Sequence, residues 1–351
     1  MKLFNSLLVA PATLGLLAPM AANANEVTIN DFNAAEEIAV TNSRVDGLEA
    51  RFNDLEAGSF SETTTASFGV DFLVGAVDGS STTEVTQFSY SMGIDLETSF
   101  TGEDLLAATI DIGNGTGVAA TDLDFNKTSD ALTLDGLAYT FPLGGTTVLV
   151  GDNTDISTVY TGACAYNAFT DHLSNCGTGN SAGVETSGVT AAASYTFDSG
   201  FSLAGGISSD PTSVLTNEGT DIYGIEAAYT ADSYGVAVAY SDNETKTFWG
   251  VNGMYAFDLA TISAGVESED AGSTTKTGFF VGLSFPEVGE GTFDIGMGTV
   301  ENYSSSDTER YTYEASYSYP INDGMTITPG VYIKEGETDQ TGFAVKTSFS
   351  F

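Results

Sequence analysis

Residues 88–97 read FSYSMGIDLE and decide the fold. Aromatic and aliphatic side chains at every second position alternate there with Ser, Gly, Asp and Glu. A period of two places the two kinds of side chain on opposite faces of a β-strand. Residues 68–75 (FGVDFLVG) and 343–351 (FAVKTSFSF) show the same alternation. Segments of about ten residues with one apolar and one small or polar face are typical of strands that cross an outer membrane in a closed barrel.

The pattern recurs along the chain and predicts an all-β protein, a transmembrane antiparallel β-barrel of about 16 strands. We expect the strands to begin near Ser67, Phe88, Asp104, Ala131, Thr146, Thr186, Phe201, Asp221, Tyr234, Lys246, Ala260, Lys276, Thr292, Arg310, Met325 and Thr341. Short connections such as residues 143–145 and 322–324 alternate with long ones such as 113–130 and 152–185. This alternation is expected when turns lie in the periplasm and loops lie outside.

The fourth strand contains one irregularity. Leu134 shares its parity with Leu132, whereas Leu137 and Tyr139 have the opposite parity. One extra residue in a strand restores a common face, so we predict a β-bulge at residues 135–136.

Two further segments are expected before the barrel, which we assign to residues 61–351. Residues 1–24 have a basic start, a short apolar run and an Ala-Asn-Ala sequence, which predict a cleaved signal peptide. Residues 25–60 form a periplasmic segment whose heptad pattern over residues 31–57 predicts a short N-terminal helix. That helix either packs on the barrel or forms a coiled coil with its copies.

The charge of the chain limits its partners. There are 48 acidic residues against 9 basic ones, a formal net charge of −39. We therefore expect no nucleic-acid partner, since such binding needs a basic surface. If the apolar faces contact lipid, the alternate positions line the lumen. The acidic residues at those positions are Asp71, Asp95, Glu97, Asp111, Glu226, Glu267, Asp294 and Glu314.

Acidic side chains along a pore lower the energy of cations and repel anions, so we predict a preference for cations. The alternative is that the acidity serves solubility or suits a saline habitat.

Signals of catalysis or metal binding are weak. His172 is the single His, and no G-x-S-x-G motif accompanies it. Asp122, Asp124 and Asn126 resemble the start of a calcium loop, but Lys127 occupies the position of its Gly. We expect no catalytic residues, no metal site and no cofactor. An outer-membrane enzyme and an adhesive barrel with a plugged lumen are the competing classes.

Two Cys, Cys164 and Cys176, lie in the longest connection. A disulfide between them is the expectation for an exported chain. A bridge over so short a loop contributes roughly 3 kcal/mol.

Two stretches resemble cyanobacterial outer-membrane porins, which are related to the carbohydrate-selective porins and include proteins labelled iron-uptake porins. One is residues 43–57 (SRVDGLEARFNDLEA), running through residues 60–65 into the first strand. The other is the last strand. Its Phe343, Val345, Phe349 and terminal Phe351 are similar to the signal that the barrel-assembly machinery reads. Larger relatives carry a surface-layer-homology domain, for which the roughly 40 residues before the barrel are too few, so we expect it to be lacking.

The resemblance implies a porin in the cell outer membrane, surrounded by lipid and forming a homotrimer, through which small hydrophilic solutes and ions, sugars included, diffuse passively. In general porins the loop after the fifth strand folds inward and narrows the channel. By that analogy the constriction candidates here are Asp155, Tyr160, Tyr166, Phe169, Asp171 and His172. The alternative is a loop that caps the outside and never enters the pore.

Overall fold

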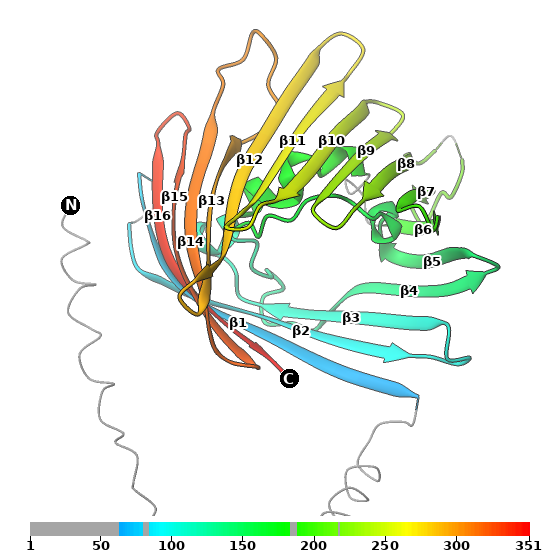
Figure 1. Cartoon of the computed structure of the whole chain (residues 1–351), viewed down its shortest axis with the longest axis horizontal. Helices are drawn as coiled ribbons and strands as arrows, with labels where there is room; N and C mark the ends of the chain where they lie inside the picture. The colour runs from blue at the N-terminus through cyan, green and yellow to red at the C-terminus, as the bar shows by residue number, and fades with distance from the viewer. Residues whose placement is uncertain (1–62, 80–83, 183–187, 217) are drawn as a thin grey trace, which may run out of the picture. The chain divides into compact units, whose positions relative to one another are not determined.

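The computed structural model describes residues 63–79, 84–182, 188–216 and 218–351, and these form a closed antiparallel barrel of sixteen strands (Figure 1). Each strand pairs with its neighbours in the sequence, and the last pairs with the first. The strands are β1 (Thr64–Asp78), β2 (Gln87–Thr98), β3 (Leu105–Gly113), β4 (Thr133–Leu143), β5 (Thr146–Thr154), β6 (Gly188–Thr196), β7 (Phe201–Ser209), β8 (Asp221–Thr230), β9 (Tyr234–Asp242), β10 (Thr247–Ala256), β11 (Thr261–Asp270), β12 (Thr275–Val288), β13 (Gly291–Thr299), β14 (Tyr311–Asn322), β15 (Met325–Lys334) and β16 (Gln340–Ser350). The predicted barrel and its strand count are confirmed.

The seam between β1 and β16 closes the barrel at the end of the chain. The Phe68 N–H donates to the Phe351 carbonyl (2.8 Å), and the Phe351 N–H donates back to Phe68 (3.1 Å). Their rings stack with centroids 5.5 Å apart. Phe349 pairs with Val70 in register. The terminal strand therefore pairs with the backbone N–H and C=O groups that the edge of an open sheet would leave unpaired.

The two faces of the wall differ in chemistry because the strands alternate. Large apolar side chains face outward, for example Leu203 (49% exposed), Ile225 (56%) and Trp249 (49%). Inward positions on the same strands hold small or polar residues such as Ser202 and Ala204. An outward apolar band on a closed barrel lets strands cross a bilayer with every backbone group paired.

The connections sort as predicted. One end of the barrel carries tight turns, such as residues 144–145, 289–290 and 323–324, and the other carries the longer connections 114–132, 155–187 and 300–310. The predicted bulge is confirmed, because Thr109 pairs with Gly136 and Ile110 with Leu134, which leaves Asp135 unopposed. Long loops mark the extracellular end of such barrels.

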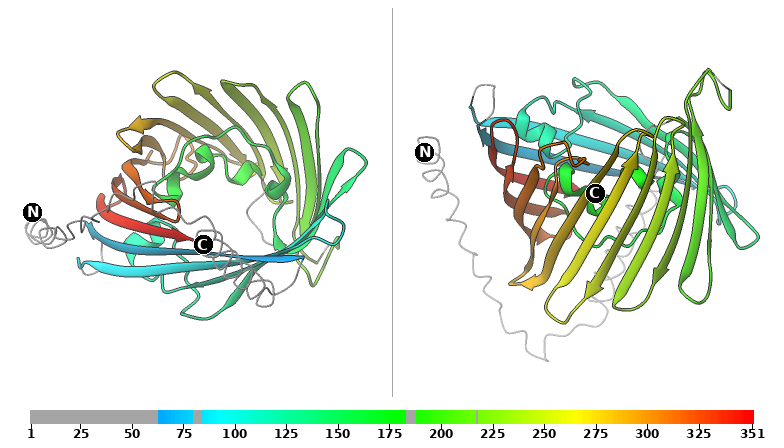
Figure 2. Two further views of the ribbon diagram at one scale, coloured as in Figure 1. Left: turned by 60° about the horizontal axis from the view of Figure 1, so that its bottom comes forward. Right: turned by 90° about the horizontal axis from the view of Figure 1, so that it is seen from above.

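Two connections turn into the barrel (Figure 2). One, here called the inner loop, is residues 155–182. It contains the 3₁₀ turns η2 (Ile156–Val159), η3 (Asp171–Gly177) and η4 (Asn180–Ala182). The other, the α3 loop, is residues 114–132 and holds the short helix α3 (Val118–Asp122). The apolar core of the protein lies where these loops meet the inner wall.

Residues 1–62 lie outside the described part of the chain, so the predicted signal peptide and periplasmic helix stay predictions. Within the described ranges, no helix is both long enough and apolar enough to span a membrane.

Candidate functional site

The inner loop follows the inner wall away from β5 toward the opposite side of the barrel. Its first turn packs Ile156 against Ala192 of β6 and Ile222 of β8. Further along, the Ala163 N–H donates to Oδ1 of Asn252 in β10 (2.9 Å), and the Ala165 N–H donates to Ser263 in β11 (3.2 Å). These partners share the inward parity of their strands, so the loop lies inside the barrel rather than above it.

Glu314 of β14 is the most heavily bonded anchor of this loop. Its Oε1 accepts from the Phe169 N–H (2.7 Å) and from the Tyr166 hydroxyl (3.0 Å). Its Oε2 accepts from the N–H (2.8 Å) and the hydroxyl (2.6 Å) of Thr170. Glu314 and Thr170 are 3% and 1% exposed. Hydrogen bonds to a buried carboxylate are about twice as strong as neutral ones, so this contact fixes the loop where it reaches the far wall.

Two more inward carboxylates repeat the arrangement. Glu226 of β8 accepts from the N–H groups of Thr161 (2.7 Å) and Gly162 (3.1 Å). Glu267 of β11 accepts from the Ser181 N–H (2.7 Å) and from the Asn180 side-chain amide (2.8 Å). We refer to Glu226, Glu267 and Glu314 together as the glutamate anchors. They satisfy loop amides that would otherwise be buried without partners.

The disulfide between Cys164 and Cys176 is confirmed, with their Cα atoms 5.8 Å apart. It closes the part of the inner loop that carries Tyr166 and Thr170, both of which bind Glu314. Cys176 is fully buried, and the Tyr166 ring packs at a tilt against the Phe280 ring of β12, with their centroids 4.9 Å apart. The bridge therefore joins the two limbs of the loop where they contact the wall.

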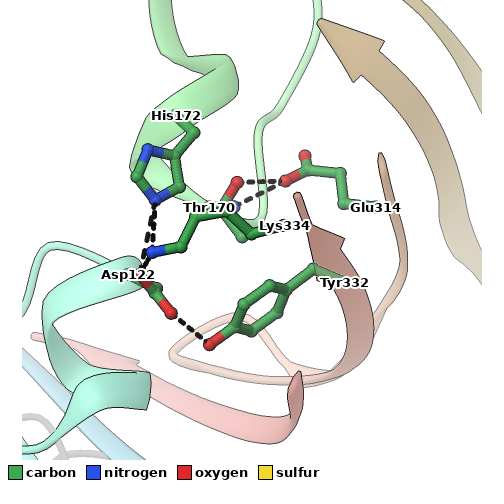
Figure 3. A network of polar contacts seen from close by, with 6 residues as sticks. All are labelled: Asp122, Thr170, His172, Glu314, Tyr332 and Lys334. Carbon is green, nitrogen blue, oxygen red and sulfur yellow. Dashed lines mark hydrogen bonds and ion pairs between the residues drawn. The ribbon is translucent and has the colours of Figure 1, made fainter. Parts of the chain in front are cut away.

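The α3 loop meets the inner loop at Asp122, the last residue of α3 (Figure 3). Oδ2 of Asp122 accepts from the Tyr332 hydroxyl (2.6 Å), and Oδ1 forms an ion pair with Lys334, both of them residues of β15. His172 of the inner loop places Nε2 3.3 Å from the same Oδ1. Burial raises the pKa of Asp122, but the hydrogen bonds from His172, Lys334 and Tyr332 outweigh it and hold this pKa below its ordinary value.

Apolar contacts accompany this junction. Phe125 of the α3 loop and Phe169 of the inner loop are buried in one cluster with Leu73 of β1 and Tyr332 of β15. Both loops and two strands on either side of the barrel seam thus share a core inside the lumen.

The wall formed by β1, β2 and β3 keeps acidic groups that these loops cover only in part, and the Asp111 carboxylate accepts a hydrogen bond from the Asn126 side chain of the α3 loop. Asp71, Asp95 and Asp111 are half-buried, and Glu97 is exposed. Asp95 accepts a hydrogen bond from the Thr109 hydroxyl (2.9 Å) on the next strand. This arrangement leaves an acidic surface facing the interior, across from the inner loop.

Comparison with known proteins identifies the family of this barrel. The sequence pattern of the Gram-negative porin family matches residues 59–341. The chain belongs to this family. A porin is a channel of the outer membrane and not an enzyme, in agreement with the weak catalytic signals in the sequence.

Relatives of this porin fall into two groups. An uncharacterized protein of Nostoc sp. is 36% identical over 141 residues, which are 40% of this chain and 24% of that protein. Pseudomonas putida OprB has a TM-score of 0.66 at 11% identity, over 82% of this chain and 94% of its own. A mutant of Rh. blastica porin has a TM-score of 0.56 at 16% identity, over 82% of this chain and all of its own. The structural similarity shows a shared fold.

Four of the eight acids predicted to line the lumen need correction. Glu226, Glu267, Asp294 and Glu314 do face inward, but they are 0–3% exposed. Loop amides cover the three glutamates because a buried N–H needs an acceptor and these inward carboxylates provide one. Asp71, Asp95, Glu97 and Asp111 keep access to the interior.

The predicted constriction residues also separate into buried residues and accessible ones. Tyr166 and Phe169 are buried against the wall and act as anchors, so they do not present their rings to the channel. Asp155 caps η2 by accepting from the Ser157 N–H (2.7 Å). Tyr160 and His172 are half-buried, and Asp171 is exposed.

Sequence reasoning missed Asn252, Asp122, Tyr332 and Lys334 as partners of the loops. Asn252 could have been found from its sequence position, since a side-chain amide at an inward position within a strand needs a hydrogen-bond partner inside the barrel. Asp122 was considered only as part of a calcium loop, but its oxygens bind Lys334 and Tyr332. Among the residues that the structure describes, no group of three or more His, Cys, Asp or Glu is placed to hold a metal ion.

Proposed function

We propose that this porin passes small hydrophilic solutes and ions by passive diffusion, through a lumen whose width is set by the inner loop. The observation that carries the proposal is the attachment of this loop to the inner wall by the three glutamate anchors. A barrel of about sixteen strands encloses a water-filled lumen, and a loop fixed inside it narrows the path. Planar-bilayer recordings of the folded protein test this. Discrete conductance steps are expected, and bilayers that hold the folded barrel but stay silent would rule it out.

We further propose that the channel prefers cations. The acids left accessible on β1, β2 and β3 support this, since carboxylates in a confined aqueous path favour cations. Reversal potentials in a salt gradient measure the preference. The double variant D95N/E97Q should lower the ratio of cation to anion permeability, whereas K346M, which removes a positive charge from an inward position of β16, should raise it. A channel that prefers anions, or that ignores both changes, would contradict the proposal.

Neutral sugars are included among the proposed solutes. The support is the resemblance of residues 43–57 to the carbohydrate-selective-porin relatives of cyanobacteria. Liposome swelling with sugars of increasing size would show which of them pass. Absence of swelling with the smallest sugar, in liposomes that conduct ions, would remove sugars from the proposal.

Export, assembly and oligomeric state complete the proposal. Residues 1–24 direct export, and the last strand, with Phe343, Val345, Phe349 and Phe351, is the signal for the barrel-assembly machinery. Residues 25–60 support a homotrimer through their heptads. Deleting Phe351 should lower the amount of folded protein in the outer membrane. Cross-linking of intact membranes should give a trimer band, and a monomer alone would refute the oligomer.

A further inference from the structure

A polar cavity separate from the inner loop lies at the extracellular end of β12 and β14. Its volume is about 360 Å³, and the connection between β13 and β14 folds over it. Tyr303 of that connection exchanges backbone hydrogen bonds with Thr277 of β12 (2.8 and 3.0 Å), which holds the connection in place. The charged residues of its lining are Lys276, Glu301, Asp307 and Arg310.

The two cations are unusual for this chain, which has 9 basic residues against 48 acidic ones. Lys276 and Arg310 are half-buried, and neither forms an ion pair with any residue that the structure describes. By contrast, Lys246 pairs with Glu269 and Lys334 pairs with Asp122. Both cations line the same concave polar site, and a guanidinium and an ammonium are each suited to binding a carboxylate.

The two acids of the cavity restrict what else can bind. Asp307 is held in place by the Ser304 N–H (2.9 Å). Hydrogen bonds from the backbone and side chain of Ser304, together with the nearby charge of Lys276, lower the pKa of Asp307 and keep it charged. Glu301 is exposed. A plain anion would meet repulsion from these two carboxylates, and a plain cation would meet repulsion from Lys276 and Arg310. A solute that carries both charges can satisfy both sets of groups.

We propose that this cavity binds a small zwitterion, a solute with a carboxylate for Arg310 and Lys276 and an ammonium for Glu301 and Asp307. The hydroxyls of Ser306 and Thr308 line the same space and can bond its remaining polar atoms. The site lies at the long-loop end, which is the extracellular end of such barrels, so it captures solute before the inner loop is reached. This inference goes beyond the proposed diffusion function and does not depend on it.

The test measures binding by saturation-transfer NMR on the folded porin in detergent micelles. Glycine, β-alanine and 4-aminobutyrate serve as zwitterions of increasing charge separation, with acetate and ethylammonium as probes of single charge. At least one zwitterion should bind ten times more tightly than either single-charge probe. R310M and K276M should each weaken it at least tenfold, which corresponds to about 1.4 kcal/mol. K246M is the matched control, since it removes a lysine outside the cavity, and it should leave binding unchanged.

Several results would overturn the inference: no zwitterion binds, acetate binds as tightly as the best zwitterion, or R310M and K276M bind like the wild type. Circular dichroism and heat-dependent mobility on gels establish that each variant is folded. Since binding is measured without current, a failure here is distinct from a failure to conduct, which bilayer recordings of the same preparation report.

Discussion

Replacing Glu314 with Gln tests whether the glutamate anchors hold the inner loop. Gln keeps one carbonyl oxygen in place of Oε1, but its amino group donates and cannot accept from Thr170. The N–H and hydroxyl of Thr170 therefore lose their acceptor. Hydrogen bonds to a charged group contribute about 1.5–3 kcal/mol each, so losing two weakens the attachment by about 3–6 kcal/mol. At 1.4 kcal/mol per factor of ten, the detached population rises about 100- to 10,000-fold.

Single-channel recording at neutral pH reads this change directly. E314Q should show frequent current steps as the loop leaves and rejoins the wall, while the melting temperature of the barrel stays close to that of the wild type because the strand ladder is intact. E97Q is the matched control, since it removes the same charge from an exposed inward position of β2 and should give quiet currents. If E314Q is as quiet as the wild type and E97Q, the glutamate does not hold the loop and the reasoning is wrong.

Other predictions concern the same loops. The double variant C164S/C176S, or reduction of the wild type, removes a disulfide that contributes roughly 3 kcal/mol. The current noise should increase while the barrel stays folded. Unchanged noise would show that the glutamate anchors hold the inner loop without the disulfide. Because the pKa of Asp122 is lowered by folding, its stabilising effect is complete above the ordinary value of 3.8 and is lost as the pH falls below it. Acidification through this range should therefore increase protease cleavage of the α3 loop, and D122N should abolish that pH dependence. K334M leaves a buried carboxylate without its cation, so about 3–5 kcal/mol should be lost at the junction; cleavage of the α3 loop at neutral pH should rise, and resistance equal to that of the wild type would contradict the assignment.

The barrel could be predicted from the sequence because its information is local. Alternation within ten residues identifies a strand, and the same parity identifies the lipid face, the bulge at Asp135 and the closing strand at Phe351. The lining of the lumen could not be derived in the same way. Whether an inward Glu meets water or a loop depends on where residues 155–182 lie, and nothing local to Glu226 or Glu314 records that.

The contacts of the inner loop show the same limit. Asp122 and Lys334 lie 212 residues apart in the sequence. Their pairing depends on two loops that fold inward together. The composition correctly indicates an acidic chain. The alternation along the strands, however, assigns every inward acid to the water-filled lumen. The requirement that buried loop amides find acceptors explains why three of those acids are used as anchors.

The position of Glu314 and Lys334 in the chain has a consequence for the order of events during biogenesis. The inner loop is synthesised well before β14 and β15, so its far attachments are not available until the last strands enter the barrel. The Cys164–Cys176 ring needs only residues of the loop itself and can form earlier, in the oxidising periplasm. A ring formed at that stage precedes the closure of the barrel at the seam between β1 and β16. The inner loop can bind Glu226 of β8 and Glu267 of β11 first, and its attachment is complete only when Glu314 enters the barrel with β14.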